Sequence, residues 1–158
     1  MKGKRRREFQ PRGRYFEEFE IGEEVTSPGR TVTETDVVMF AALSGDYNQL
    51  HTDAEFAKGT MFGERIAHGL LGLSIAGGLA SRLGFIEGTA LALLGLTWKF
   101  RKPILIGDTI AVYGKVAQKK EMPKLGGGIV VFDLEVVNQR EETAQKGQWT
   151  VLVASKPS

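Results

Sequence analysis

The sequence predicts a single α+β domain in which an antiparallel sheet packs on one central helix. Residues 69–83 form the least polar helical segment, with apolar side chains around most of its circumference, as expected for a helix buried inside a fold. Several short runs after this helix alternate between apolar and polar residues, which is the pattern of strands. Because no helices separate these runs, they cannot form parallel β–α–β units and must pair antiparallel.

Two short helices are expected before the central one. Thr33 and Asp36 have the spacing of a capping box at the start of a helix, and Gly45 is placed to end it. Asp53 is placed to cap a second short helix. The polar stretch between them, residues 46–52, is predicted to form a turn.

Four strands are expected after the central helix, which Gly84 should end. The alternating segments cover residues 90–100, 109–116, 129–137 and 148–154. Turn-forming residues separate them at 106–108, 123–128 and 138–142. Upstream, residues 21–25 are predicted to form a turn and a strand, and residues 30–32 an extended segment.

The composition is that of an ordinary domain of 158 residues, 42% of them hydrophobic. The absence of cysteine excludes a disulfide framework, a thiolate nucleophile and a cysteine-ligated zinc or iron–sulfur site. With only two histidines, we expect no metal site, and we expect no cofactor. No apolar run approaches the roughly 20 residues that span a membrane, and the basic start is not followed by an apolar signal core, so a cytoplasmic location is expected.

The positive charge is concentrated at the N-terminus. Residues 1–14 hold seven basic side chains and one acid, so that removing them from the totals of 21 and 19 leaves a body with net charge −4. Such a segment can contact nucleic acid, an acidic lipid surface or a phosphate. No aromatic residues are interleaved to stack on bases. We therefore predict a solvated, disordered extension over residues 1–14, no nucleic-acid or membrane partner, and a single domain over residues 15–158.

Three polar side chains suited to proton transfer lie close together in the predicted turn. Asp46, Asn48 and His51 fall within six positions. A carboxylate and an imidazole can hold one water molecule between them and exchange protons near neutral pH. On spacing alone, a polar loop with a surface histidine is the favoured interpretation, and the rest of the chain changes that balance.

Two motifs lie in order along the chain. Residues 44–53 are Ser-Gly-Asp-Tyr-Asn-Gln-Leu-His-Thr-Asp and residues 67–71 are Ala-His-Gly-Leu-Leu. Downstream, residues 100–109 include Phe-Arg-Lys-Pro-Ile and Ile-Gly-Asp-Thr. Together they resemble the MaoC-like, or R-specific enoyl-CoA hydratase, family of hotdog-fold proteins over about residues 15–154. Gln49 stands where proline is usual in that family, which removes a backbone restraint from the loop.

The resemblance implies a hotdog fold, a homodimer or higher homo-oligomer, and an acyl thioester of coenzyme A or acyl carrier protein as substrate. Asp46 and His51 would be the catalytic pair that adds water across the 2,3-double bond, giving an R-3-hydroxyacyl product, or runs the reverse reaction. Asn48 would orient the loop, and the backbone N–H of Gly69 would stabilise negative charge on the thioester oxygen. Ser74 would be a supporting polar group.

Two other functions remain open at this point: a hotdog thioesterase, and a non-catalytic subunit that binds acyl thioesters. Acyl-chain length and the choice between coenzyme A and carrier protein are also open. For His68, either a second acid or base or a structural histidine bonded to backbone near the helix start is consistent with the sequence, and we favour the structural role.

Overall fold

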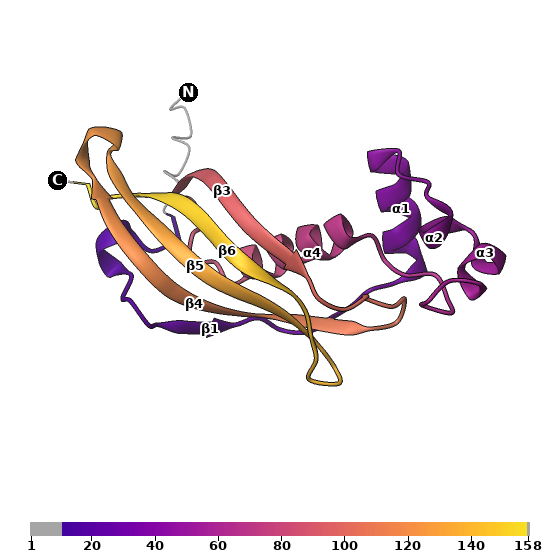
Figure 1. The fold of residues 1–158 in the computed structure, drawn as a ribbon. Helices are drawn as coiled ribbons and strands as arrows, with labels where there is room; N and C mark the ends of the chain where they lie inside the picture. The colour runs from indigo at the N-terminus through magenta and orange to yellow at the C-terminus, as the bar shows by residue number, and fades with distance from the viewer. Residues whose placement is uncertain (1–10, 158) are drawn as a thin grey trace, which may run out of the picture.

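The computed structural model describes residues 11–157 (Figure 1). The first half contains the 3-10 helix η1 (Phe16–Glu18), strands β1 (Glu24–Thr26) and β2 (Arg30–Thr31), and helices α1 (Glu34–Ser44), α2 (Gln49–Thr52) and α3 (Ala54–Lys58). The second half contains helix α4 (Gly69–Arg82), strands β3 (Ala90–Phe100) and β4 (Thr109–Met122), the 3-10 helix η2 (Pro123–Leu125), and strands β5 (Gly127–Asn138) and β6 (Thr143–Ala154).

The strands form one antiparallel sheet in the order β1-β4-β5-β6-β3, with β2 also pairing with β4. Helix α4 runs along one side of this sheet, and α1, α2 and α3 form a separate lobe beyond its N-terminal end (Figure 1). The predicted α+β architecture, an antiparallel sheet around one central helix, is confirmed. Among residues 11–157, strand β3 pairs only with β6 and therefore forms one edge of the sheet.

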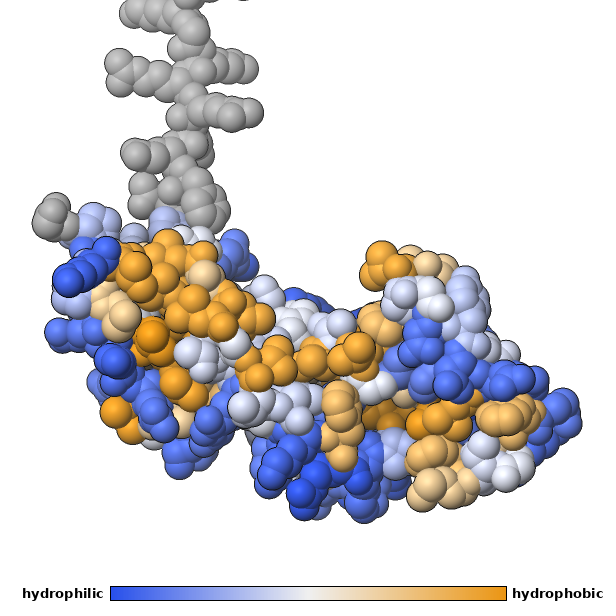
Figure 2. All heavy atoms as spheres, turned by 45° about the horizontal axis from the view of Figure 1, so that its top comes forward, coloured by the Kyte–Doolittle hydropathy of each residue, from blue (hydrophilic) through white to orange (hydrophobic). Residues whose placement is uncertain are grey.

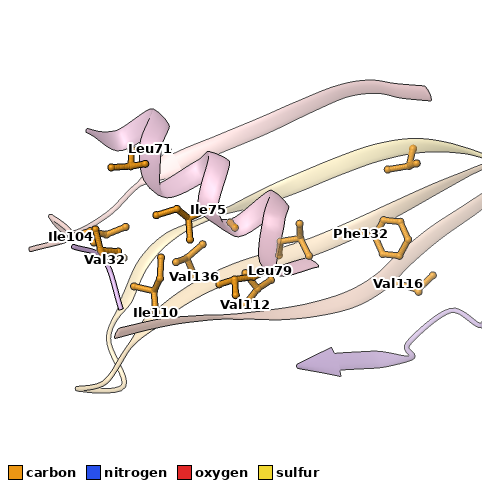
Figure 3. Close-up of a cluster of buried hydrophobic side chains, with 14 of the residues drawn as sticks. Val32, Leu71, Ile75, Leu79, Ile104, Ile110, Val112, Val116, Phe132 and Val136 are labelled. Carbon is orange, nitrogen blue, oxygen red and sulfur yellow. The ribbon is translucent and has the colours of Figure 1, made fainter. Parts of the chain in front are cut away.

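The core lies between α4 and the inner face of the sheet (Figure 3). Leu71, Ile75 and Leu79 follow one another along the buried side of the helix, each at most 6% exposed. The alternation predicted for β4 and β5 is confirmed over residues 110–116 and 130–136, where every second residue is buried. These inward residues are Ile110, Val112, Gly114, Val116, Val130, Phe132, Leu134 and Val136.

The predicted helix ends are also confirmed. The backbone N–H of Asp36 donates to the Thr33 hydroxyl at 3.3 Å, and the backbone N–H of Thr33 donates to the Asp36 carboxylate at 2.8 Å. Gly45 ends α1 with φ of 75°, a left-handed conformation that glycine adopts without a steric penalty. The Asp53 carboxylate accepts the N–H of Phe56 and so caps α3.

Three strands are longer than predicted; β5 gains two residues at its start and one at its end, and β4 and β6 gain more. Strand β4 continues past residue 116 because a bulge between Val116 and Gln118 breaks the two-residue alternation on which the prediction depended. Strand β6 begins at Thr143 rather than 148, through a polar stretch that includes Gly147, where a Cβ would clash with the carbonyl of Thr97. Residues 49–52 form the short helix α2 within the predicted turn.

The predicted disorder of residues 1–14 does not hold for its last part. The N–H of Gly13 donates to the carbonyl of Glu87, and the N–H of Arg14 to that of Phe85, each at 2.8 Å. Arg12 also pairs with the Glu87 carboxylate. These bonds attach residues 12–14 to the rest of the domain. Residues 1–10 lie outside the described part of the chain. Within residues 11–157, no helix has the length and apolarity needed to cross a membrane.

Candidate active site

The site is built on the loop that joins α1 to α2. The Asn48 side chain accepts the N–H of Leu50 at 3.0 Å and so caps α2. The backbone N–H of Asn48 in turn donates to the Asp46 carboxylate at 3.2 Å. Asn48 therefore shapes the loop through backbone contacts, in keeping with the orienting role that the resemblance implies. Asp46 remains exposed.

His51 lies on α2 and is 9% exposed. Its Nδ1 is 2.8 Å from the carbonyl oxygen of Ile66. Because a carbonyl oxygen only accepts hydrogen bonds, the neutral ring carries its proton on Nδ1 and has a lone pair on Nε2. The buried carbonyl thus selects the tautomer in which Nε2 can accept a proton.

His68 immediately precedes α4 and is 2% exposed. Its Nε2 is 2.9 Å from the backbone carbonyl oxygen of Asp46. The ring stacks on His51 with a centroid separation of 3.9 Å and an interplanar angle of 29°, and the ring of Phe40 lies 4.9 Å away. The predicted backbone bond of His68 near the helix start is confirmed.

Asp46, His51 and His68 converge, since one carboxylate oxygen and one ring nitrogen from each histidine lie within 4.8 Å of one another. The structure thus brings together the two predicted catalytic side chains. A metal ion fits this arrangement poorly, because a ring nitrogen directs its lone pair in the plane of the ring and two nearly parallel stacked rings cannot both aim at one ion. The carboxylate and Nε2 of His51 are instead suited to a water molecule.

Gly69 is the first residue of α4, so its N–H lies in the first turn, where no intrahelical acceptor is available. A Cβ at this position would lie 2.9 Å from atoms of the Phe100 ring. Glycine therefore leaves room for the close approach of the β3 side chain. The Gly69 N–H, which we predicted to be a donor, lies next to His68 at the positive end of the helix dipole.

Gln145 is a buried residue of the site region that the sequence analysis did not identify. It is 2% exposed, and its side-chain amide donates to the Gly69 carbonyl at 3.0 Å while accepting the indole N–H of Trp98 at 2.9 Å. Its position opposite Val136, an inward residue of β5, is the signal that could have revealed it. That signal depended on recognising that β6 begins at Thr143.

A cavity of about 490 Å³ borders this region, and His51, Gly69 and Gln145 are among its lining residues. Apolar side chains, including Phe62 and Phe100, form much of its wall. Asp46, Asn48 and Ser74 do not belong to this lining. The Ser74 hydroxyl donates to the carbonyl of Leu70 at 2.8 Å on an exposed part of α4, so the structure does not bring Ser74 to the cavity.

The segment that carries His68 is bonded to the loop before β4. The N–H of Ala67 donates to the carbonyl of Ile104 at 2.8 Å, and the N–H of Leu105 donates to the Asp108 carboxylate at 3.0 Å. Burial raises the pKa of Asp108, but hydrogen bonds from Arg140, Leu105 and the neighbouring Gln139 outweigh that effect and leave the pKa below its usual value. Asp108 therefore stays ionised and supports the loop.

Comparison with known proteins gives a consistent result. The model of the MaoC-like domain family matches residues 17–138. An (R)-specific enoyl-CoA hydratase from Rhodospirillum rubrum is 37% identical over 111 residues, covering 67% of this chain and 74% of that protein. Protein MaoC from Klebsiella aerogenes is 41% identical over 103 residues, covering 65% of this chain but only 30% of its own length.

Solved structures agree with the sequence matches. A monoamine oxidase regulatory protein from Archaeoglobus is 40% identical with a TM-score of 0.86, covering 92% of this chain and 97% of that one. An R-hydratase from Pseudomonas aeruginosa is 30% identical with a TM-score of 0.75, covering 90% and 86%. A Mycobacterium tuberculosis protein with a double hotdog fold has a TM-score of 0.81 at 18% identity, covering 95% of this chain and 47% of that one, and supports the hotdog architecture alone.

Proposed function

Because the chain belongs to the MaoC-like dehydratase family, we propose that it is an R-specific enoyl-thioester hydratase, which adds water across the 2,3-double bond of an enoyl thioester of coenzyme A or acyl carrier protein and also runs the reverse dehydration. The observation that carries this proposal is the convergence of Asp46 and His51 within 4.8 Å. The printed names of the relatives, hydratase and dehydratase, point to the same hydro-lyase chemistry.

In the proposed reaction, one water molecule sits between the Asp46 carboxylate and Nε2 of His51. The pair accepts a proton from the water as its oxygen bonds to C3, and the π electrons move toward the thioester as an enolate. A proton from the pair then reaches C2, so that water has added in full and both side chains return to their initial state. Since the two groups lie so close, acid and base roles belong to the pair.

The negative charge on the thioester oxygen needs a donor that is already in place. We assign this role to the N–H of Gly69, which lacks an intrahelical acceptor and lies at the positive end of α4. A donor of this kind is typically worth about 3–4 kcal/mol in the transition state. The proposal includes no metal or other cofactor, because the chain's own acid, base and backbone donor suffice for the addition of water.

The proposal includes a homodimer formed through β3. This strand is an edge of the sheet, and its apolar side chains are unusually exposed, with Leu93 at 54% and Leu94 at 50%. Figure 2 shows hydrophobic residues in a band across the side of the molecule where β3 runs. An exposed apolar edge strand favours pairing with another chain, and a second copy offers the same edge. A cytoplasmic location is also part of the proposal, which cell fractionation would test.

The decisive experiment is incubation of the purified protein with crotonyl-CoA, following the loss of enoyl absorbance and the configuration of the 3-hydroxy product. We expect R-3-hydroxybutyryl-CoA, and an activity reduced roughly 100-fold or more in Asp46→Asn and His51→Ala. Asp53→Asn is the matched control: it removes a carboxylate from the same region, and asparagine caps α3 equally well. Full activity in both Asp46→Asn and His51→Ala would reject the proposed catalytic pair.

The same assay separates the alternatives. Release of free coenzyme A thiol without hydration would identify a thioesterase. Binding of acyl-CoA without either reaction would identify a non-catalytic subunit. A panel of enoyl-CoA and enoyl carrier-protein substrates of different length and branching would then define the preferred acyl group and carrier.

A further inference from the structure

We propose that His68 is a positioning residue for the catalytic pair, acting through a hydrogen bond to the backbone of Asp46 and through stacking on His51. The inference rests on the proposed function and deepens it, by assigning a role to a buried titratable side chain that the hydration steps do not use. Two hydrogen bonds run in opposite directions between the loop at residues 46–51 and the segment at residues 66–68, and they support this role.

The two histidines are held as opposite tautomers. Nε2 of His68 faces the carbonyl of Asp46 at 2.9 Å, whereas Nδ1 of His51 faces the carbonyl of Ile66 at 2.8 Å. Each carbonyl can only accept, so neutral His68 carries its proton on Nε2 and neutral His51 on Nδ1. His68 thus donates to the chain at Asp46, and His51 donates back to the chain just before His68.

Nδ1 of His68 is buried and, among the described residues, has no hydrogen-bond partner. If the ring at position 68 served only for packing, an apolar side chain would do equally well. It would also leave no buried nitrogen without a hydrogen-bond partner. The donor on the opposite side of the ring, Nε2–H, is therefore the feature that distinguishes histidine from phenylalanine at this position. Its acceptor is the backbone of a proposed catalytic residue.

The ring of His68 also contacts both His51 and Phe40, with centroid separations of 3.9 and 4.9 Å. It thereby contacts both α2 and α1, the two helices that flank the Asp46 loop. The Thr52 hydroxyl bonds the loop carbonyls of Tyr47 and Asn48, but the Asp46 side chain has little support of its own. Asp46 is exposed, and within the described chain its carboxylate accepts only a 3.2 Å bond from Asn48. A shift of about 1 Å in such a group can lower a rate 100-fold.

Two variants separate donation from packing. His68→Gln keeps an N–H donor at a reach similar to that of Nε2, and His68→Phe keeps an aromatic ring without a donor. We expect His68→Phe to lower kcat for crotonyl-CoA hydration at least tenfold with KM within about twofold, and His68→Gln to retain kcat within about threefold. Equal kcat in His68→Phe and the wild type would overturn the proposal, as would equal losses in both variants.

A double-mutant cycle with Asp46→Asn tests whether the effect passes through Asp46. If His68 positions Asp46, His68→Phe should lower kcat much less in the Asp46→Asn background than in the wild type. If the kcat losses of the two single variants simply multiply in the double variant, the two residues act independently. That result would reject the positioning role of His68. Thermal melts of each variant establish that the compared proteins are folded.

Nitrogen-15 NMR of the wild type tests the geometry without relying on activity. The chain has only two histidines, so each ring signal can be assigned with one variant. We expect neutral His68 as the Nε2–H tautomer and neutral His51 as the Nδ1–H tautomer. The Nδ1–H tautomer at His68 would overturn the inference even if the protein hydrates crotonyl-CoA. Expected tautomers in a protein without hydratase activity would instead refute the proposed function and leave the bond intact.

Discussion

The side-chain amide of Gln145 donates to the carbonyl oxygen of Gly69 at 3.0 Å, linking strand β6 to the first residue of the central helix. The same side chain accepts the indole N–H of Trp98 from β3. A single buried glutamine therefore satisfies one donor and one acceptor from two other elements, at the end of α4 where the proposed oxyanion donor lies.

Replacing Gln145 with leucine should destabilise the protein by about 1–3 kcal/mol, because the Gly69 carbonyl and the Trp98 indole would both lose a buried partner. Urea unfolding measures the change. Gln148→Leu is the matched control on the same strand, because its amide bonds to Asp133 at an exposed position, and it should change the stability by less than about 0.5 kcal/mol. Equal effects of the two substitutions would contradict the role of Gln145.

Alanine at Gly69 should reduce both stability and hydration rate. Its Cβ would press on the Phe100 ring at 2.9 Å, and overpacking of this kind typically costs about 1–3 kcal/mol. Removing the ring should relieve the conflict. Urea unfolding should therefore show that Gly69→Ala costs clearly less in a Phe100→Ala background than alone; an unchanged cost would mean that the ring is not the obstacle.

Acid should weaken the contact between the hairpin at residues 138–142 and its neighbours. Hydrogen bonds from Asn138, Lys102 and Arg140 lower the pKa of Glu142 to about 2. Because this folded-state pKa lies below the ordinary glutamate value of 4.5, the stabilisation is present above about pH 4.5 and is lost as the pH falls toward 2. Glu142→Gln should thus be less stable than the wild type at pH 7, with the difference vanishing near pH 2.

Urea unfolding across this pH range checks the expected convergence. Glu141→Gln is the control, because the carboxylate of Glu141 is next to Glu142 in sequence but forms no ion pair within residues 11–157. A stability difference between Glu142→Gln and the wild type that stayed constant from pH 7 to pH 2 would show that this carboxylate does not couple folding to protonation.

A charge on the edge strand should prevent the proposed dimer. Leu94→Lys places a cation on β3, where desolvating it against a second copy would be unfavourable. Light scattering coupled to gel filtration should report a smaller assembly than for the wild type. Leu125→Lys, at an equally exposed leucine on η2 (51% against 50%), should leave the mass unchanged. A dimeric Leu94→Lys protein would place the interface elsewhere.

Deletion of residues 2–14 should leave turnover intact but lower the stability. The deletion removes the ion pairs of Arg12 and Arg14 and the backbone bonds of residues 13 and 14, for which we expect a loss of about 1–3 kcal/mol. Deletion of residues 2–10 keeps these contacts and serves as the comparison. A large loss of turnover in either truncated protein would give the segment a functional role.

The predictable parts of the structure are those with a local or periodic cause. Thr33 and Asp36 cap a helix through groups three residues apart, and Val112 and Val136 lie inward because strands alternate. Asp46 and His51 are brought together over five positions by one capped turn. The spacing alone therefore marked Asp46 and His51 as candidates, and the family resemblance identified them as the pair and supplied the chemistry.

The parts that escaped prediction depend on contacts between distant segments. The inward position of Gln145 follows only from the start of β6 at Thr143, within a polar stretch where hydrophobic alternation gives no signal. The bond from His68 to Asp46 ends on a backbone carbonyl, an acceptor that every residue possesses and that no side-chain pattern marks. The bonds of Gly13 and Arg14 likewise end on carbonyls of a loop more than 70 positions away.

The reciprocal bonds between residues 46–51 and residues 66–68 hold the catalytic pair without a hydrogen bond from the stretch that joins the two segments. Residues 54–65 contribute Phe62 and Met61 to the cavity wall without holding either catalytic side chain. This connecting stretch is therefore the place to graft loops from other hydratases, in order to exchange acyl selectivity while the reactive centre is preserved.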